Sequence, residues 1–140
     1  MTYPDDLLHR ILDETRVIAL VGWSPKAERP SHGVARYLAR RGYRVIPVNP
    51  GHPGLVTEWG EAVRATLADI GEPVDMVDIF RNSGAVEGVV DEALTSLAGV
   101  KTIWMQLGVV NEAAARKAEA AGLTVIMNRC PAIEIPRLFG

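Results

Sequence analysis

The feature of this sequence that most constrains its fold is a set of five short, almost continuously apolar runs that alternate with helical patterns. A strand with one solvent-exposed face alternates apolar and polar side chains, and most of these runs do not. Near-continuous apolar runs are typical of parallel strands that are covered on both faces. The predicted strands are residues 16–21, 43–48, 74–80, 101–105 and 123–127.

Helical patterns lie before and between these runs. The clearest covers residues 84–97, where apolar side chains recur at intervals of three and four residues, and Ser83 is its expected N-cap. Further helices are expected over residues 4–14, 31–42 and 111–122, with a short one within 61–68. Strands that alternate with helices form βαβ units, each with a right-handed crossover.

These units predict a Rossmann-like, doubly wound α/β fold with helices on both faces of a five-stranded parallel sheet. Residues 1–140 are expected to form this one domain, since the length is usual for a single domain. We expect the strand order 3-2-1-4-5, with a ligand site where the order reverses, between the first and fourth strands. Pro47 conflicts with its strand, because proline lacks the N–H of a ladder hydrogen bond. We retain the strand because Pro47 lies near its end.

Composition and charge exclude several classes of function. The formal net charge of -2 gives no general attraction for nucleic acid or anionic membranes. No apolar run approaches the ~20 residues that cross a bilayer, and the acidic start does not match a signal peptide. The single cysteine, Cys130, excludes an internal disulfide and a thiolate metal cage. We therefore expect a cytoplasmic protein in which any anion site is local.

The loop after the first strand is the strongest candidate for an anion site. The strand ends at Gly22, where the absence of a side chain allows the backbone to approach a ligand closely. The helix that begins near Ser31 offers free N–H groups and the positive end of its dipole. Lys26 and Arg29 would add positive charge to the same loop. The alternative is that Ser31 only caps the helix and that both basic side chains are solvated.

This segment differs from the dinucleotide-binding motif, which requires G-x-G-x-x-G. Gly22 is followed by Trp23, Ser24 and a longer loop. An acid that holds the adenosine ribose is also expected after the second strand, and this chain has Asn49 followed by Pro50. The sequence therefore disfavours NAD as a ligand, and Asn49 is either a ligand contact or an ordinary turn residue.

Four segments together resemble the small CoA-binding-domain proteins. Residues 22–32 are similar to the family segment G-x-S-x-x-x-x-R-P-S-H, and residues 43–50 to its Y-x-V-x-P-V-N-P, which includes the conflicting proline. Residues 75–81 resemble the third strand of the family, and residues 128–134 its closing segment. The same fold forms the N-terminal domain of the succinyl-CoA ligase α subunit. The resemblance covers nearly the whole chain and implies that coenzyme A is the ligand.

By this resemblance, CoA would touch the loop after the first strand and the ends of the second, third and fourth strands. The residues implied as contacts are Gly22, Trp23, Ser24, Lys26, Arg29, Asn49, Pro50, Phe80, Arg81, Gln106 and Gly108. The ligase α subunit has a second domain with a phosphorylated histidine, and a glycine-rich turn where this chain has its longer loop. The chain ends at Gly140, near the end of that first domain. We therefore expect CoA binding to carry over, and acyl-CoA synthesis not to.

The other reactive side chains form no complete catalytic set. His9, His32 and His52 are scattered without carboxylate or cysteine neighbours at ligand spacing, so no metal site is expected. Cys130 is expected to be a small buried residue, and the alternative is that it meets the CoA thiol. Asp75 and Asp78 lie three apart in a predicted strand, so their side chains point to opposite faces.

The leading hypothesis is a stand-alone module that binds CoA or an acyl-CoA, with no nucleic-acid or membrane partner. A protein partner, the acyl group and the oligomeric state stay open. The alternative is an enzyme that acts on a CoA thioester or another nucleotide, through Cys130 or His32 or together with a partner subunit. A nicotinamide-dependent oxidoreductase is the third class, and the absence of the dinucleotide motif disfavours it.

Overall fold

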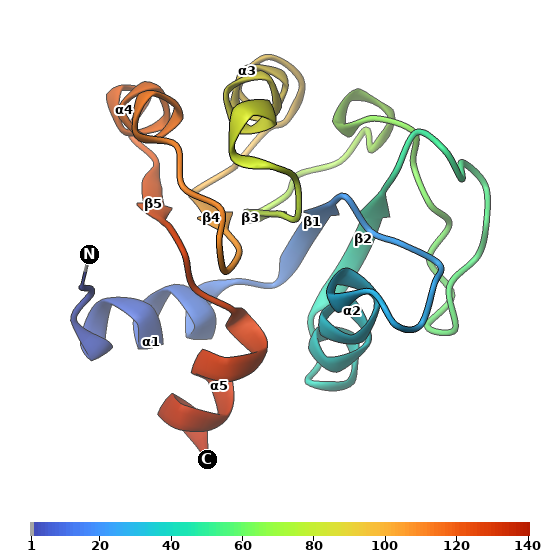
Figure 1. The fold of residues 1–140 in the computed structure, drawn as a ribbon, viewed down its shortest axis with the longest axis horizontal. Coiled ribbons are helices and arrows are strands. Elements are labelled where there is room, and N and C mark those ends of the chain that lie inside the picture. Colours follow the sequence, from blue (N-terminus) through green and yellow to red (C-terminus); the bar gives the residue numbers. More distant parts are fainter. Residues whose placement is uncertain (1) are drawn as a thin grey trace.

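The computed structural model describes residues 2–140, in which a parallel sheet is covered by helices on both faces (Figure 1). This confirms the Rossmann-like α/β fold. No helix in the described range is long and apolar enough to span a bilayer. The strands are β1 (Val17–Val21), β2 (Arg44–Val48), β3 (Met76–Ile79), β4 (Thr102–Met105) and β5 (Thr124–Ile126). The helices are α1 (Asp5–Glu14), α2 (Pro30–Arg40), α3 (Val86–Ser96), α4 (Glu112–Ala120) and α5 (Pro131–Phe139), with 3-10 turns η1 (Leu67–Asp69) and η2 (Ser83–Ala85).

Alternate strand positions build a separate apolar core on each face of the sheet. On one face, α3 and α4 pack against strand residues that include Ala19 and Val77. On the other face, α1, α2 and α5 pack against residues that include Leu20 and Trp104. Figure 1 shows the same division, with α3 and α4 above the sheet and the other three helices below it. Because both faces are buried, the strands are apolar at almost every position.

The strand order is 2-1-3-4-5, so the predicted order 3-2-1-4-5 is wrong. β3 pairs with β1 on the side away from β2. The reason lies in the connection between β2 and β3, residues 49–75. Its buried Leu67 and Ile70 belong to the core beneath α3 and α4, on the face opposite α2. A right-handed crossover on the opposite face steps across the sheet in the opposite direction, which places β3 beyond β1.

The observed order makes β2 an edge strand, and this resolves the conflict at Pro47. The carbonyl oxygen of Pro47 accepts from Arg64 N (3.0 Å), which lies on the side away from β1. The N–H and C=O of one strand residue point to the same side, so the missing N–H of Pro47 faces the edge of the sheet. Proline is tolerated at such positions because no ladder hydrogen bond is lost.

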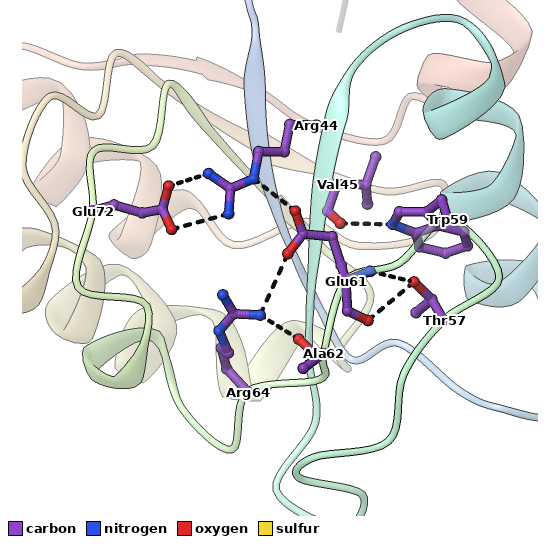
Figure 2. Close-up of polar contacts among 8 residues, drawn as sticks. All are labelled: Arg44, Val45, Thr57, Trp59, Glu61, Ala62, Arg64 and Glu72. Atoms are coloured by element: carbon purple, nitrogen blue, oxygen red, sulfur yellow. Dashed lines mark hydrogen bonds and ion pairs between the residues drawn. The ribbon is translucent and has the colours of Figure 1, made fainter.

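A polar network ties the β2–β3 connection to the start of β2 (Figure 2). Arg44 Nε donates to Glu61 Oε1 (2.6 Å), and the two amino groups of Arg44 donate to the carboxylate of Glu72. These two carboxylates raise the pKa of Arg44 above its ordinary value. Trp59 Nε1 donates to the carbonyl oxygen of Val45 (2.9 Å) from the same connection. The network holds a long segment of little regular structure against the sheet edge.

The helix predicted within residues 61–68 is wrong. Ala62 instead pairs with Val56 and Arg64 with Val48 in isolated β-bridges, and only the short turn η1 follows. The free edge of β2 offers backbone hydrogen-bond partners, and pairing with it overrides the local helical preference.

One helix cap and one whole helix here also differ from prediction. Asn82, not Ser83, caps the helical segment that leads into α3, because its side chain accepts from Ala85 N (3.1 Å). α5 lies outside every predicted element, and it contains Pro131 and Pro136, which favour a helix break by sequence alone. Pro131 occupies the first turn, where its missing N–H has no intrahelical partner to lose.

Candidate functional site

Three adjoining cavities lie at the carboxyl-terminal ends of β1 to β4, and we call them together the edge groove. The central cavity (about 450 Å³) lies between the ends of β1 and β2 and helix α3. The loop cavity (about 340 Å³) lies under the loop after β1, and the β4 cavity (about 330 Å³) lies beside the loop after β4. Phe80, which follows β3, borders all three. Ligands of open α/β sheets bind at this edge.

The observed strand order moves the reversal point of the sheet. The direction of the crossovers changes between β1 and β3, and not between the first and fourth strands as predicted. Gly22 at the end of β1 and Phe80 at the end of β3 flank this point, and both line the edge groove. The correction shifts the expected centre of the site by one strand along the same edge.

Two further cavities, of about 330 and 200 Å³, open at the opposite edge of the sheet. Arg16, which lines the first, immediately precedes β1, and Asp75, which lines the second, immediately precedes β3. These cavities therefore lie at the amino-terminal ends of the strands, where open α/β sheets do not hold their ligands. We place the candidate site in the edge groove.

Gly22 allows β1 to end in close contact with β3. Its φ of +91° lies in the left-handed region, and a Cβ atom here would lie 2.2 Å from the carbonyl oxygen of Phe80. Its N–H donates to the carbonyl oxygen of Val48 at 2.9 Å, which joins it to β2 as well. Only glycine combines a φ in the left-handed region with the absence of a Cβ atom. Gly22 therefore brings the ends of three strands together at the floor of the groove.

The first turn of α2 holds the loop after β1 in place. Ser24 N donates to Ser31 Oγ (3.0 Å), and the carbonyl oxygen of Ser24 accepts from His32 Nδ1 (2.9 Å). His32 Nε2 accepts from Arg36 (3.1 Å), so Nδ1 is the ring nitrogen that donates to Ser24. The ring also stacks on Trp23, with 5.8 Å between centroids. His32 therefore acts as a positioning residue for this loop.

Three cationic side chains surround the groove. One of them, Arg29, occupies the N-cap of α2 in an extended conformation (φ -80°, ψ 137°). Because α2 begins at Pro30, the predicted alternative of Ser31 as the cap is wrong. Lys26 and Arg29 line the loop cavity, and Arg81 lines the central and β4 cavities. All three are exposed, and none makes an ion pair with another residue in the described range 2–140. Their charge is available to an anion in the groove.

The side chain of Asn49 links two segments of the site. Its Nδ2 donates to the carbonyl oxygen of Trp23 (2.6 Å), and its Oδ1 accepts from Gly51 N (2.8 Å). Asn49 therefore fixes the loop after β1 against the turn after β2, and it also lines the central and loop cavities. Pro50 lies in that turn and lines the central cavity.

Some buried polar atoms at this edge have no hydrogen-bond partner among residues 2–140. They include Trp23 Nε1, whose residue lines the loop cavity, and Gln106 Oε1, whose residue lines the β4 cavity. Buried polar atoms are normally paired in folded proteins. The interior beside the groove therefore holds one unpaired donor and one unpaired acceptor, and both atoms are themselves buried.

Asp78 is wholly buried in β3, and neither of its carboxyl oxygens has a hydrogen-bond partner within the described residues. Burial raises the pKa of Asp78 to about 8, so the side chain is mostly a neutral acid at pH 7. Asp75 differs, because it accepts two hydrogen bonds of 2.9 Å from backbone N–H groups at the start of β1. The two aspartates lie in separate environments and cannot act as a pair.

The edge groove brings together ten of the eleven predicted contact residues. The exception, Gly108, forms the turn after β4 with a φ of +80° and donates to Asn128 Oδ1 (2.8 Å). Cys130 is buried at the start of α5 and does not line the groove. Leu107 and Val109 line the β4 cavity and were not predicted. The apolar residues that follow the end of β4 in the sequence could have indicated that Leu107 and Val109 line a cavity.

A family model and a curated relative both match most of this chain. The family model described as a CoA binding domain matches residues 16–136. Uncharacterized protein YneT of Bacillus subtilis (strain 168) is 37% identical over 123 residues, which span 88% of this chain and 87% of that protein.

The same fold occurs in solved structures, both as nearly a whole small protein and as one part of a longer chain. A hypothetical protein from Pyrococcus horikoshii OT3 is 36% identical with a TM-score of 0.90, covering 99% of this chain and 94% of that chain. The apo form of the dinucleotide-forming acetyl-coenzyme A synthetase 1 of Ca. Korarchaeum cryptofilum is 25% identical with a TM-score of 0.66. That match covers 84% of this chain and 27% of the synthetase chain.

Proposed function

The chain belongs to the family of CoA-binding domains, and from this premise we propose that it binds coenzyme A or an acyl-CoA in the edge groove. The observation that carries the proposal is the division of the groove into a cationic part and an apolar part. CoA is divided in the same way, with phosphates at its nucleotide end and a pantetheine arm at the other. Calorimetric titration of the protein with CoA tests the proposal.

The phosphates are assigned to the loop cavity. Lys26 and Arg29 lie there without an acidic partner in the described range, and α2 begins at Pro30 beside them. The free N–H groups and the dipole of a helix start favour an anion at this position. The proposed contacts are Gly22, Trp23, Ser24, Lys26, Arg29, Asn49, Pro50, Phe80, Arg81, Gln106 and, outside the cavities, Gly108.

Arg29 is proposed as the principal contact to the phosphates, and its replacement by alanine should weaken CoA binding about 10- to 150-fold. This range follows from the roughly 1.5–3 kcal/mol of a charge-assisted hydrogen bond. Arg29→Lys should recover only part of the affinity, because an ammonium group cannot reproduce the planar fork of a guanidinium. Thermal unfolding should hardly change, since Arg29 is exposed. Titration calorimetry of the three proteins measures the effect.

Three further variants locate the charge contact. Lys26→Ala and Arg81→Ala remove the other cations of the groove, and Arg116→Ala removes an exposed arginine of α4 as the matched control. Arg116→Ala should bind CoA as the native protein does. Unchanged affinity in a folded Arg29→Ala protein would refute the assignment. A loss confined to Arg81→Ala would move the phosphates to the end of β3.

A further inference from the structure

The β4 cavity differs from the loop cavity in the chemistry of its lining. Its walls are Pro30, Phe80, Leu107 and Val109, together with Gln106 and Arg81. A volume of about 330 Å³ is at the lower end of the range of ligand pockets, which begins near 300 Å³. Four of the six lining side chains are apolar, so the cavity favours a ligand segment that is largely apolar.

One polar atom of a residue that lines this cavity lacks a partner. Gln106 is 6% exposed, and its Oε1 accepts no hydrogen bond from any residue in 2–140. Its backbone is fixed, because Gln106 N donates to the carbonyl oxygen of Ile79 (3.2 Å) at the end of β3. Buried acceptors are normally paired in folded proteins, so a bound group that brings a donor would satisfy Gln106 Oε1. The amide N–H groups of a pantetheine arm are donors of this kind, set among methylene and methyl groups.

The rim of the β4 cavity includes the exposed apolar side chain of Leu107. Leu107 is 51% exposed and Val110, three residues further on, is 39% exposed. Their loop is well anchored, because Gly108 N donates to Asn128 Oδ1 (2.8 Å) and Val110 N donates to Ser83 Oγ (3.0 Å). The loop therefore keeps Leu107, which lines the β4 cavity, exposed at its mouth.

We infer that the β4 cavity holds the thioester end of the ligand, and that the ligand is an acyl-CoA whose apolar acyl chain lies over Leu107. The inference rests on the proposed function, because it extends the same groove away from the cationic loop. Gln106 accepts from a pantetheine amide, and the chain beyond the sulfur covers the exposed rim. Arg81 is the single charge in this cavity, and four apolar walls outweigh it in favour of an uncharged chain.

Titration calorimetry with CoA, acetyl-CoA, hexanoyl-CoA and succinyl-CoA tests the inference. Each methylene that leaves water should tighten binding about fourfold. Because the rim is open on one side, we expect hexanoyl-CoA to bind about tenfold or more tightly than acetyl-CoA. Succinyl-CoA should gain nothing over acetyl-CoA, and hexanoate alone should not bind.

Matched variants assign the gain to this rim. Leu107→Ala should lower the ratio of hexanoyl-CoA affinity to acetyl-CoA affinity about threefold or more, because it removes apolar contact area. Leu94→Ala replaces an exposed leucine of α3 outside the groove and should leave that ratio unchanged. Gln106→Leu should weaken acetyl-CoA and hexanoyl-CoA by similar factors, since both carry the same pantetheine arm.

The outcomes separate this inference from the proposed function. If CoA binds and the hexanoyl chain adds no affinity, the acyl site is refuted while CoA binding stands. If succinyl-CoA binds most tightly, Arg81 selects an acidic acyl group and the apolar assignment is wrong. If none of the CoA compounds binds, the proposed function itself fails.

Discussion

Replacing Gly22 with alanine is expected to lower the free energy of unfolding by about 2–5 kcal/mol. A side chain in the left-handed region costs about 1–2 kcal/mol, and Gly22 has a φ of +91°. The new Cβ atom would also lie 2.2 Å from the carbonyl oxygen of Phe80, and relieving an overpacked contact costs roughly 1–3 kcal/mol more. Urea denaturation of the variant and the native protein measures the difference.

Gly122 supplies the matched control for this substitution. Its φ of +89° is nearly the same, and a Cβ atom there would meet nothing within 4 Å. Gly122→Ala should therefore carry only the backbone cost, and the excess loss in Gly22→Ala measures the contact between β1 and β3. Equal losses in the two variants would show that the strand ends do not need this close approach. CoA binding should also suffer in Gly22→Ala, because Phe80 borders every cavity of the groove.

Asp78 should make the protein less stable as the pH rises from about 4 to about 8. Burial raises its pKa to about 8 in the folded protein, whereas an unfolded aspartate has a pKa of about 3.9. Between these values the folded state keeps a proton that the unfolded state releases, so stability falls with rising pH. Below this range both states are protonated, and above it both are ionised, so the contribution becomes constant.

Asp78→Asn isolates this contribution, because asparagine is similar in shape and does not titrate. The stability of the variant relative to the native protein should increase between pH 5 and pH 8 by up to roughly 4 kcal/mol, at about 1.4 kcal/mol for each unit. Thermal or urea denaturation over this range provides the data. Asp6→Asn, at an exposed position of α1, is the control and should show a far smaller change. If the difference in stability between Asp78→Asn and the native protein does not change with pH, the buried acid does not hold its proton.

The fold class follows from the sequence because every strand carries the same physical signal. A strand buried on both faces is apolar at nearly every position, whichever neighbours it has. The strand order depends instead on which face of the sheet each connection crosses, and apolar side chains do not specify a face. Pro47 was the residue that carried this information. A proline within a strand is best accommodated at an edge, and only the observed order places β2 there.

The candidate site was predictable in part. Glycine at the end of β1 and basic residues before α2 mark an anion site through general properties of the fold, and the groove indeed contains them. The positioning role of His32 was not predictable, because it depends on Ser24, Trp23 and Arg36 meeting in space. The lack of a hydrogen-bond partner for Asp78 among residues 2–140 was equally hidden, since a buried charged residue is ordinarily paired.

The most direct test of the account is a calorimetric comparison of CoA and NAD on the native protein. The loop after Gly22 lacks the dinucleotide motif, and Asn49 stands where an acid would hold the ribose of NAD. We therefore expect CoA to bind with a 1:1 stoichiometry and at least about ten times more tightly than NAD, a difference of about 1.4 kcal/mol. Binding of NAD with equal or higher affinity, or no heat with CoA, would contradict the assignment of the edge groove to coenzyme A.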